Sequence, residues 1–125
     1  MAEMRELIAE IDRENVGLVL DSWHWYTAGE TVDDVRRLTN RDVVACDLND
    51  APRSVPVDQQ RDGVRELPCA TGVIDVRGFL AALAEIGYDG PVRAEPFNAT
   101  LRTLPAEEAV AATAKAMKTA FALLG

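Results

Sequence analysis

The sequence has little histidine or cysteine and no long apolar run. One histidine and two cysteines, Cys46 and Cys69, stand among 125 residues, which excludes a disulfide framework and any Cys-x-x-Cys site. No apolar stretch approaches the roughly 20 residues of a membrane-spanning helix. Residues 1–15 alternate charged and aliphatic side chains and lack the apolar region of a signal peptide. We therefore expect a cytoplasmic protein with no membrane partner.

Positive charge is also scarce. The chain carries 13 lysines and arginines against 21 aspartates and glutamates, a formal net charge of -8. Because a nucleic-acid backbone is a polyanion, this balance disfavours a nucleic-acid partner. A glycine-rich phosphate loop and a Ser-His-Asp signature are absent as well. The length, with 48% hydrophobic and 27% charged residues, is that of a single globular domain over residues 1–125.

Apolar residues follow two alternating patterns along the chain. Short continuous apolar runs, typical of strands buried on both faces, occur at residues 16–20 and 43–46. A third strand is predicted at residues 91–95, which Pro91 opens and which end at Glu95 before Pro96. Stripes with helical spacing occur at residues 4–11, 31–38, 75–86 and 105–124. Because strands that alternate with helices form parallel sheets, this order predicts an α/β fold of three parallel strands and four helices. Residues 49–74 show neither pattern, and a loop of that length is usually functional.

An acidic residue stands at the end of each predicted strand: Asp21, Asp47 and Glu95. The carboxyl ends of parallel strands meet at one edge of the sheet, where α/β proteins bind ligands. Three converging carboxylates repel one another unless a divalent cation or protons compensate their charge. This placement predicts a metal site, and the alternative is that the acids cap helices or lie in solvated loops.

Further candidates lie close to these acids. His24 follows Asp21 by three residues and is expected to act as a ligand, a substrate donor or a proton carrier; the alternative is a hydrogen-bonded structural histidine. Trp23 and Trp25 flank it and are predicted to wall a substrate pocket. Arg65, in the 49–74 loop, is the arginine best suited to clamp an anionic or hydroxylated substrate.

Strand alternation places two more residues. Cys46 is out of phase with Asp47 and should face the helices as a small core residue. Arg93 should lie on the same face as Glu95, one layer below it. Because a buried guanidinium needs a partner, we predict that it contacts Asp21, Asp47 or another inward acid.

Three segments together resemble a known family. Residues 16–24 contain the Asp-x-x-His strand of the xylose isomerase-like TIM barrels, which include sugar phosphate isomerases/epimerases and the endonuclease IV group. Residues 65–75 are similar to the family loop R-x-x-P-G-x-G-x-x-D, with Pro68-Cys69 in place of Pro-Gly, and residues 87–95 resemble its GYxG-strand-Glu ending. By this resemblance the chain is the C-terminal part of a (β/α)8 barrel, matching strands β6–β8.

The resemblance implies roles for individual residues. Asp21 and Glu95 match metal ligands, and Glu95 also matches an acid/base that moves a proton next to a carbonyl. His24 matches a histidine near the metal or substrate, and Arg65 matches a substrate-binding position. Asp47 stands where relatives carry His or Gln as a ligand, so the resulting all-oxygen site favours Mg²⁺ or Mn²⁺ over Zn²⁺.

The implied function is that of a metal-dependent sugar or sugar-phosphate isomerase/epimerase. A full barrel needs about 250 residues, so the isolated chain is expected to be incomplete and to pair with a missing N-terminal half-barrel or with copies of itself. One alternative is a catalytically inactive half-barrel that serves as an interaction module. An endonuclease IV-like enzyme, against which the single histidine and the net charge argue, and a dehydratase relative stay open as well.

Overall fold

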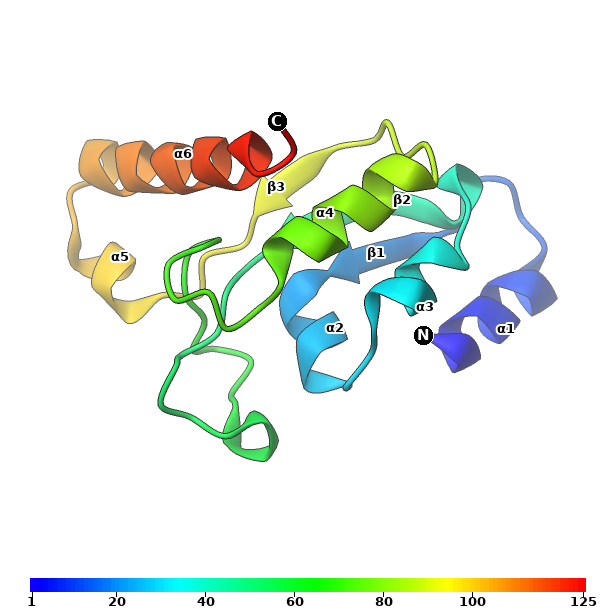
Figure 1. The fold of residues 1–125 in the computed structure, drawn as a ribbon, viewed down its shortest axis with the longest axis horizontal. Helices are drawn as coiled ribbons and strands as arrows, with labels where there is room; N and C mark the ends of the chain where they lie inside the picture. The colour runs from blue at the N-terminus through cyan, green and yellow to red at the C-terminus, as the bar shows by residue number, and fades with distance from the viewer.

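A computed structural model describes residues 1–125, and a three-stranded parallel sheet lies at its centre (Figure 1). The strands β1 (Leu18–Asp21), β2 (Val43–Leu48) and β3 (Val92–Ala94) lie in the order β1-β2-β3. Asp21 pairs with Asp47, and Asp47 pairs with Arg93. The predicted parallel strands are therefore confirmed, and their carboxyl ends are level with one another.

Six α-helices accompany the strands. They are α1 (Ala2–Ile11), α2 (Ser22–Thr27), α3 (Val32–Arg36), α4 (Val76–Glu85), α5 (Ala99–Thr103) and α6 (Ala106–Ala122), with 3-10 turns at Asn40–Asp42 and Val57–Gln59. The four predicted helices are present as α1, α3, α4 and α6. The structure adds α2 and α5, which are too short to show a helical stripe and begin at side-chain caps from Asp21 and Asn98.

The hydrophobic core lies between the sheet and the helices α3 and α4, which cover one of its faces (Figure 1). Leu20, Cys46 and Leu48 point into it from the strands and meet Val35 of α3 and Phe79 of α4. The predicted core position of Cys46 is confirmed. Its burial, with the nearby charges of Asp47 and Asp21, raises the pKa of the thiol far above its usual value, so it stays protonated.

The opposite face of the sheet is open. Val19 lies on the same face as Asp21, two residues along the strand, and it is 54% exposed. None of the residues of helix α1 is buried, and the apolar side chains of Met4, Leu7 and Ile11 are exposed. The side of the sheet that carries the predicted acids is therefore exposed at Val19, although Asp21 and Asp47 themselves are buried.

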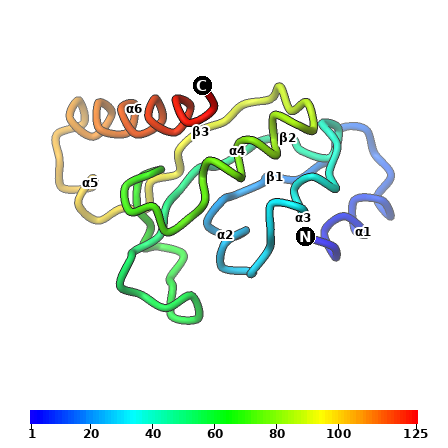
Figure 2. The backbone as a smooth tube through the Cα atoms, in the orientation of Figure 1, coloured from blue at the N-terminus to red at the C-terminus, as the bar shows by residue number.

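Residues 49–74 leave the carboxyl ends of the strands, run away from the sheet and return to it (Figure 2). An isolated bridge between Asp50 and Glu66 ties the two arms of this loop together. Cys69 adopts a left-handed backbone conformation with φ of 65°, which glycine adopts more readily than any other residue. Cys69 therefore has the backbone conformation of a glycine at the position where the family loop carries one. None of the helices is both long and apolar enough to cross a membrane.

Helix α4 depends on a side-chain cap at its start. The Asp75 carboxylate accepts a hydrogen bond of 2.9 Å from the Gly78 N–H, satisfying one of the donors that a helix N-terminus leaves free. We expect Asp75→Ala to lower the free energy of unfolding by about 1 kcal/mol, measured by urea denaturation. Asp75→Asn keeps a capping oxygen and is expected to lose much less, so an equal loss in both variants would contradict the capping role.

Candidate metal and substrate site

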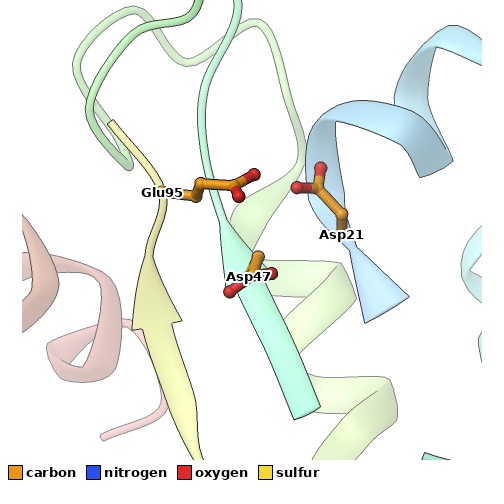
Figure 3. Close-up of side chains that lie close together, drawn as sticks. All are labelled: Asp21, Asp47 and Glu95. Atoms are coloured by element: carbon orange, nitrogen blue, oxygen red, sulfur yellow. The ribbon is translucent and has the colours of Figure 1, made fainter. Parts of the chain in front are cut away.

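Three carboxylates converge at the carboxyl ends of the strands. Asp21 is the last residue of β1, Asp47 lies in β2, and Glu95 directly follows β3. One oxygen from each lies within 4.8 Å of the others. In Figure 3 the Glu95 and Asp21 side chains point toward each other across β2, with Asp47 between them. Asp21 and Asp47 are buried and Glu95 is half-buried. The structure thus brings together the three acids that the strand ends predicted.

Asp21 uses its two oxygens in different ways. Oδ1 accepts the backbone N–H groups of Trp23 at 2.7 Å and His24 at 3.0 Å, which caps α2. Oδ2 faces the cluster and accepts from Asn49 Nδ2 at 3.1 Å and Arg65 Nη1 at 2.8 Å. Helix capping and membership of the acidic cluster, which the sequence presented as alternatives, are therefore both true of this residue.

Arg65 lies in the middle of the site and is only 2% exposed. Its guanidinium carbon lies 4.9 Å from the ring centre of Trp23 and 5.0 Å from that of Phe97. Nη1 donates to Asp21 at 2.8 Å and to Glu95 at 2.7 Å. Although burial alone would lower the pKa of Arg65, the hydrogen bond to Asp62 and the surrounding carboxylates raise it above its usual value. The group is therefore permanently charged.

A second arginine compensates Asp47. The contact predicted for Arg93 is confirmed, because its Nε and Nη2 both donate to the Asp47 carboxylate, Nη2 at 3.1 Å. The hydrogen bond to Asp47 and the charge of that carboxylate raise the pKa of Arg93. The Arg93 side chain is 61% exposed rather than buried, because no further strand covers this face of the sheet.

The aromatic residues and His24 lie around the cluster in different settings. His24 is exposed, and its Nε2 lies 3.3 Å from both Arg65 Nη2 and Asp62 Oδ1. The Trp23 ring meets His24 edge-on at 5.1 Å. Trp25 packs against Phe79 in the core, and it also lines a pocket of about 180 Å³ beside β1, together with Asp21 and His24.

Three residues of the site were not predicted. Asp62 supplies a carboxylate and a carbonyl to Arg65, Asn49 donates to Asp21, and Phe97 covers the guanidinium of Arg65. Asp62 lies three residues before Arg65, a spacing that allows contact but is too common to identify one. Asn49 directly follows β2, and Phe97 is the third residue after the end of β3; this closeness to the strand ends was the signal in the sequence that could have indicated them.

The donor set fits a divalent cation. Carboxylate oxygens are the ligands that hard divalent cations prefer, and the cluster offers three within reach of one ion. The Asn49 side chain beside Asp21 is fully buried, and its Oδ1 has no hydrogen-bond partner. Asp21, Asp47 and Glu95 are therefore suited to hold a metal ion on the open side of the sheet.

Comparison with known proteins identifies the family. The family model described as xylose isomerase-like TIM barrel matches residues 1–120, so the chain belongs to this family. Inosose isomerase of Bacillus subtilis (strain 168) is 32% identical over 105 residues, which are 84% of this chain and 37% of that protein. 3-Dehydroshikimate dehydratase of Pseudomonas aeruginosa is 31% identical over 101 residues, 80% of this chain and 16% of that protein.

A solved structure agrees with this assignment. The crystal structure of the IolI protein with a bound zinc atom matches with a TM-score of 0.88 and 29% identity, over 96% of this chain and 42% of the IolI chain. The predicted family and the partial TIM-barrel fold are thereby confirmed. The chain spans about 37% of the length of the inosose isomerase that it matches.

Proposed function

We propose that this chain forms the metal-binding part of an isomerase that moves a proton next to the carbonyl group of a cyclic polyol ketone or a related sugar. The observation that carries the proposal is the convergence of Asp21, Asp47 and Glu95 within 4.8 Å at the ligand-binding edge of the sheet. The similarity to inosose isomerases supports the substrate class. In this reading Asp21, Asp47 and Glu95 hold the cation.

Glu95 and His24 are the groups suited to move the proton. A divalent cation at this site acts as a Lewis acid that polarises the substrate carbonyl. The Glu95 side chain is 40% exposed on the open side of the cluster, so its free oxygen can reach a substrate. His24 is 62% exposed, and an imidazole can both accept and donate a proton near neutral pH. Glu95 therefore serves as the acid/base, and His24 as a second proton carrier or a substrate donor.

Arg65, Trp23 and Trp25 are the groups proposed to bind substrate. The Trp23 ring contacts both Arg65 and His24. Trp25 lines the pocket beside β1 that Asp21 and His24 also line. Both indoles are buried, so they form apolar backing behind the charged groups of the site, and a ring-shaped polyol, with apolar C–H faces and hydroxyl edges, is complementary to that combination.

The active form needs a cover for the open face of the sheet. Val19 and Arg93 are exposed beside the acids, and β1 and β3 each have an unpaired edge. Unpaired strand edges bind further strands. We propose that either an N-terminal half-barrel or further copies of this chain supply the missing wall of the substrate site.

The proposed ligands are all carboxylate oxygens, and this determines which metals the site is expected to prefer. Carboxylates favour Mg²⁺ or Mn²⁺, whereas nitrogen and sulfur ligands suit Zn²⁺. The IolI structure holds zinc. Titration with Mg²⁺, Mn²⁺ and Zn²⁺ under the same conditions is expected to show that this chain binds Mg²⁺ or Mn²⁺ at least as tightly as Zn²⁺.

Calorimetric titration of the purified chain with Mn²⁺ tests the site directly. We expect about one site per chain and a loss of affinity of about 100-fold or more in Asp21→Asn, because even the partners of metal ligands contribute tenfold or more. Asp12→Asn removes the same charge at an exposed position after α1 and should bind like the wild type. Absence of binding in the wild-type chain would overturn the metal-dependent function and favour an interaction module.

Dehydration is the second candidate, favoured by the similarity to 3-dehydroshikimate dehydratases. Both reactions begin with removal of a proton next to a carbonyl, so Asp21, Asp47 and Glu95 would have the same roles in each. The two are separated by following the substrates by NMR in D₂O. Isomerisation exchanges hydrogen for deuterium without loss of water, whereas dehydration yields an unsaturated product.

A further inference from the structure

The guanidinium of Arg65 has no free hydrogen-bond donor. An arginine side chain carries five N–H groups; four of them donate to oxygen atoms here, and the fifth faces His24 Nε2, which accepts it in the tautomer that carries its hydrogen on Nδ1. Nε donates to the Asp62 carbonyl, Nη1 to Asp21 and Glu95, and Nη2 to the Asp62 carboxylate with His24 Nε2 at 3.3 Å. As the structure stands, Arg65 has nothing left with which to bind a substrate.

Two of these partners are proposed metal ligands. Nη1 lies 2.8 Å from Asp21 Oδ2 and 2.7 Å from Glu95 Oε2, so a single nitrogen bridges both carboxylates. Hydrogen bonds this short between a guanidinium and a carboxylate are strengthened by the opposite charges. A divalent cation that binds the same oxygens must compete with the guanidinium for them, because two cations at one pair of carboxylates repel each other.

The rest of Arg65 is held independently of these two contacts. Its backbone N–H donates to the Phe97 carbonyl at 2.9 Å, and its carbonyl accepts from Asn98 Nδ2 at 3.0 Å. The rings of Trp23 and Phe97 contact the guanidinium at about 5 Å. Loss of the contacts from Nη1 to the carboxylates therefore leaves the residue anchored in the site.

We propose that Arg65 is the built-in counter-cation of Asp21 and Glu95, and that a divalent metal ion binds by exchange with its Nη1 group. This inference rests on the proposed metal site and adds a residue that limits the affinity of that site for the metal. Arg65 stabilises the charges of Asp21 and Glu95 while no metal is bound, and it lowers the affinity for the metal. The exchange also frees the Nη1 hydrogens for a hydroxyl or an anionic group of the substrate.

The test is a Mn²⁺ titration of Arg65→Met beside a matched control. Methionine keeps an unbranched apolar side chain between Trp23 and Phe97 but removes the charge. We expect the dissociation constant for Mn²⁺ to fall by about tenfold or more, since charges this close interact strongly even when solvent screens them. Arg102→Met removes an exposed guanidinium 5.9 Å from the ring centre of the same Phe97, with no contact to the acids, and should leave the affinity unchanged.

The outcomes separate the two proposals. If neither the wild type nor Arg65→Met binds Mn²⁺, the metal-dependent function fails. If the wild type binds and Arg65→Met binds equally or more weakly, the metal site stands and the counter-cation role is overturned. Tighter binding in Arg65→Met than in the wild type supports the exchange, whereas a wild-type chain that binds no Mn²⁺ overturns the metal-dependent function whatever the variant does.

A second measurement uses the wild-type chain and so does not depend on how the variant folds. Guanidinium N–H groups that are buried and hydrogen-bonded exchange slowly with water, and ¹⁵N-resolved NMR detects them. Addition of the diamagnetic Mg²⁺ is expected to shift the Arg65 Nη1 resonance and to speed its exchange, while the Nε resonance, bonded to the Asp62 carbonyl, moves less. A spectrum in which Arg65 Nη1 keeps its position and its exchange rate while Mg²⁺ is bound would contradict the proposal.

Discussion

Glu95→Gln is expected to abolish deuterium exchange at the carbon next to the substrate carbonyl while the chain keeps its fold. Glutamine has the size of glutamate and still offers Arg65 one oxygen, so the contact from Nη1 survives. It cannot accept a proton near neutral pH. General acid/base catalysis contributes about 10²- to 10⁴-fold to a rate, and a loss of that size is the expected result. The measurement is ¹H NMR of an inosose in D₂O with Mn²⁺ and the chain assembled with the partner or the further copies that complete the substrate site.

The control for this prediction is Glu107→Gln. Glu107 is exposed in the first turn of α6 and has no contact with the acidic cluster, so the exchange rate should match that of the wild type. Circular dichroism and the melting temperature establish whether both variants fold. A folded Glu95→Gln variant with unchanged exchange would assign the proton transfer to another group, with His24 as the next to replace.

The strand ends of this protein were predictable because a parallel sheet has a simple geometry. Each apolar run stops at an acid, and the carboxyl ends of parallel strands must lie at the same edge. The register then places Asp21 directly beside Asp47. The same alternation put Cys46 in the core and Arg93 against Asp47. Periodicity thus predicted the three acids, the face they share and one of their two arginine partners.

The periodicity of apolar residues could not predict which residues meet at the centre of the site. The sequence predicts a substrate-binding role for Arg65 but not its contacts to Asp21 and Glu95. These contacts depend on the path of the 49–74 loop, which has no repeating pattern. Phe97 and Asn49 belong to the site because the chain turns sharply after β3 and β2. Arg93 is exposed because no further strand covers its face of the sheet, and the pattern of residues along the chain could not predict that.

The path of that loop depends on one buried carboxylate, and replacing Asp50 by asparagine is expected to cause a large loss of stability. Asp50 is fully buried. Its Oδ1 accepts the N–H groups of Ala51 at 2.8 Å and Ile74 at 3.0 Å, and its Oδ2 accepts those of Thr71 at 2.9 Å and Gly72 at 2.7 Å. Asparagine would place an NH₂ group against two of these donors. Each buried donor left unsatisfied costs about 1–3 kcal/mol, so a loss of about 3 kcal/mol is expected in urea denaturation.

Asp58→Asn is the matched control, since Asp58 is exposed in the same loop, and it should leave the free energy of unfolding unchanged. The backbone of Asp50 also pairs with Glu66, the residue after Arg65, at 2.8 and 2.9 Å. Loss of the Asp50 carboxylate should therefore loosen the segment that carries Arg65 and expose residues 49–74 to proteolysis. An Asp50→Asn variant as stable and protease-resistant as the control would mean that other contacts hold the loop. If the variant loses stability and protease resistance as expected, the position of Arg65 against Asp21 and Glu95 is set by a carboxylate outside the metal site.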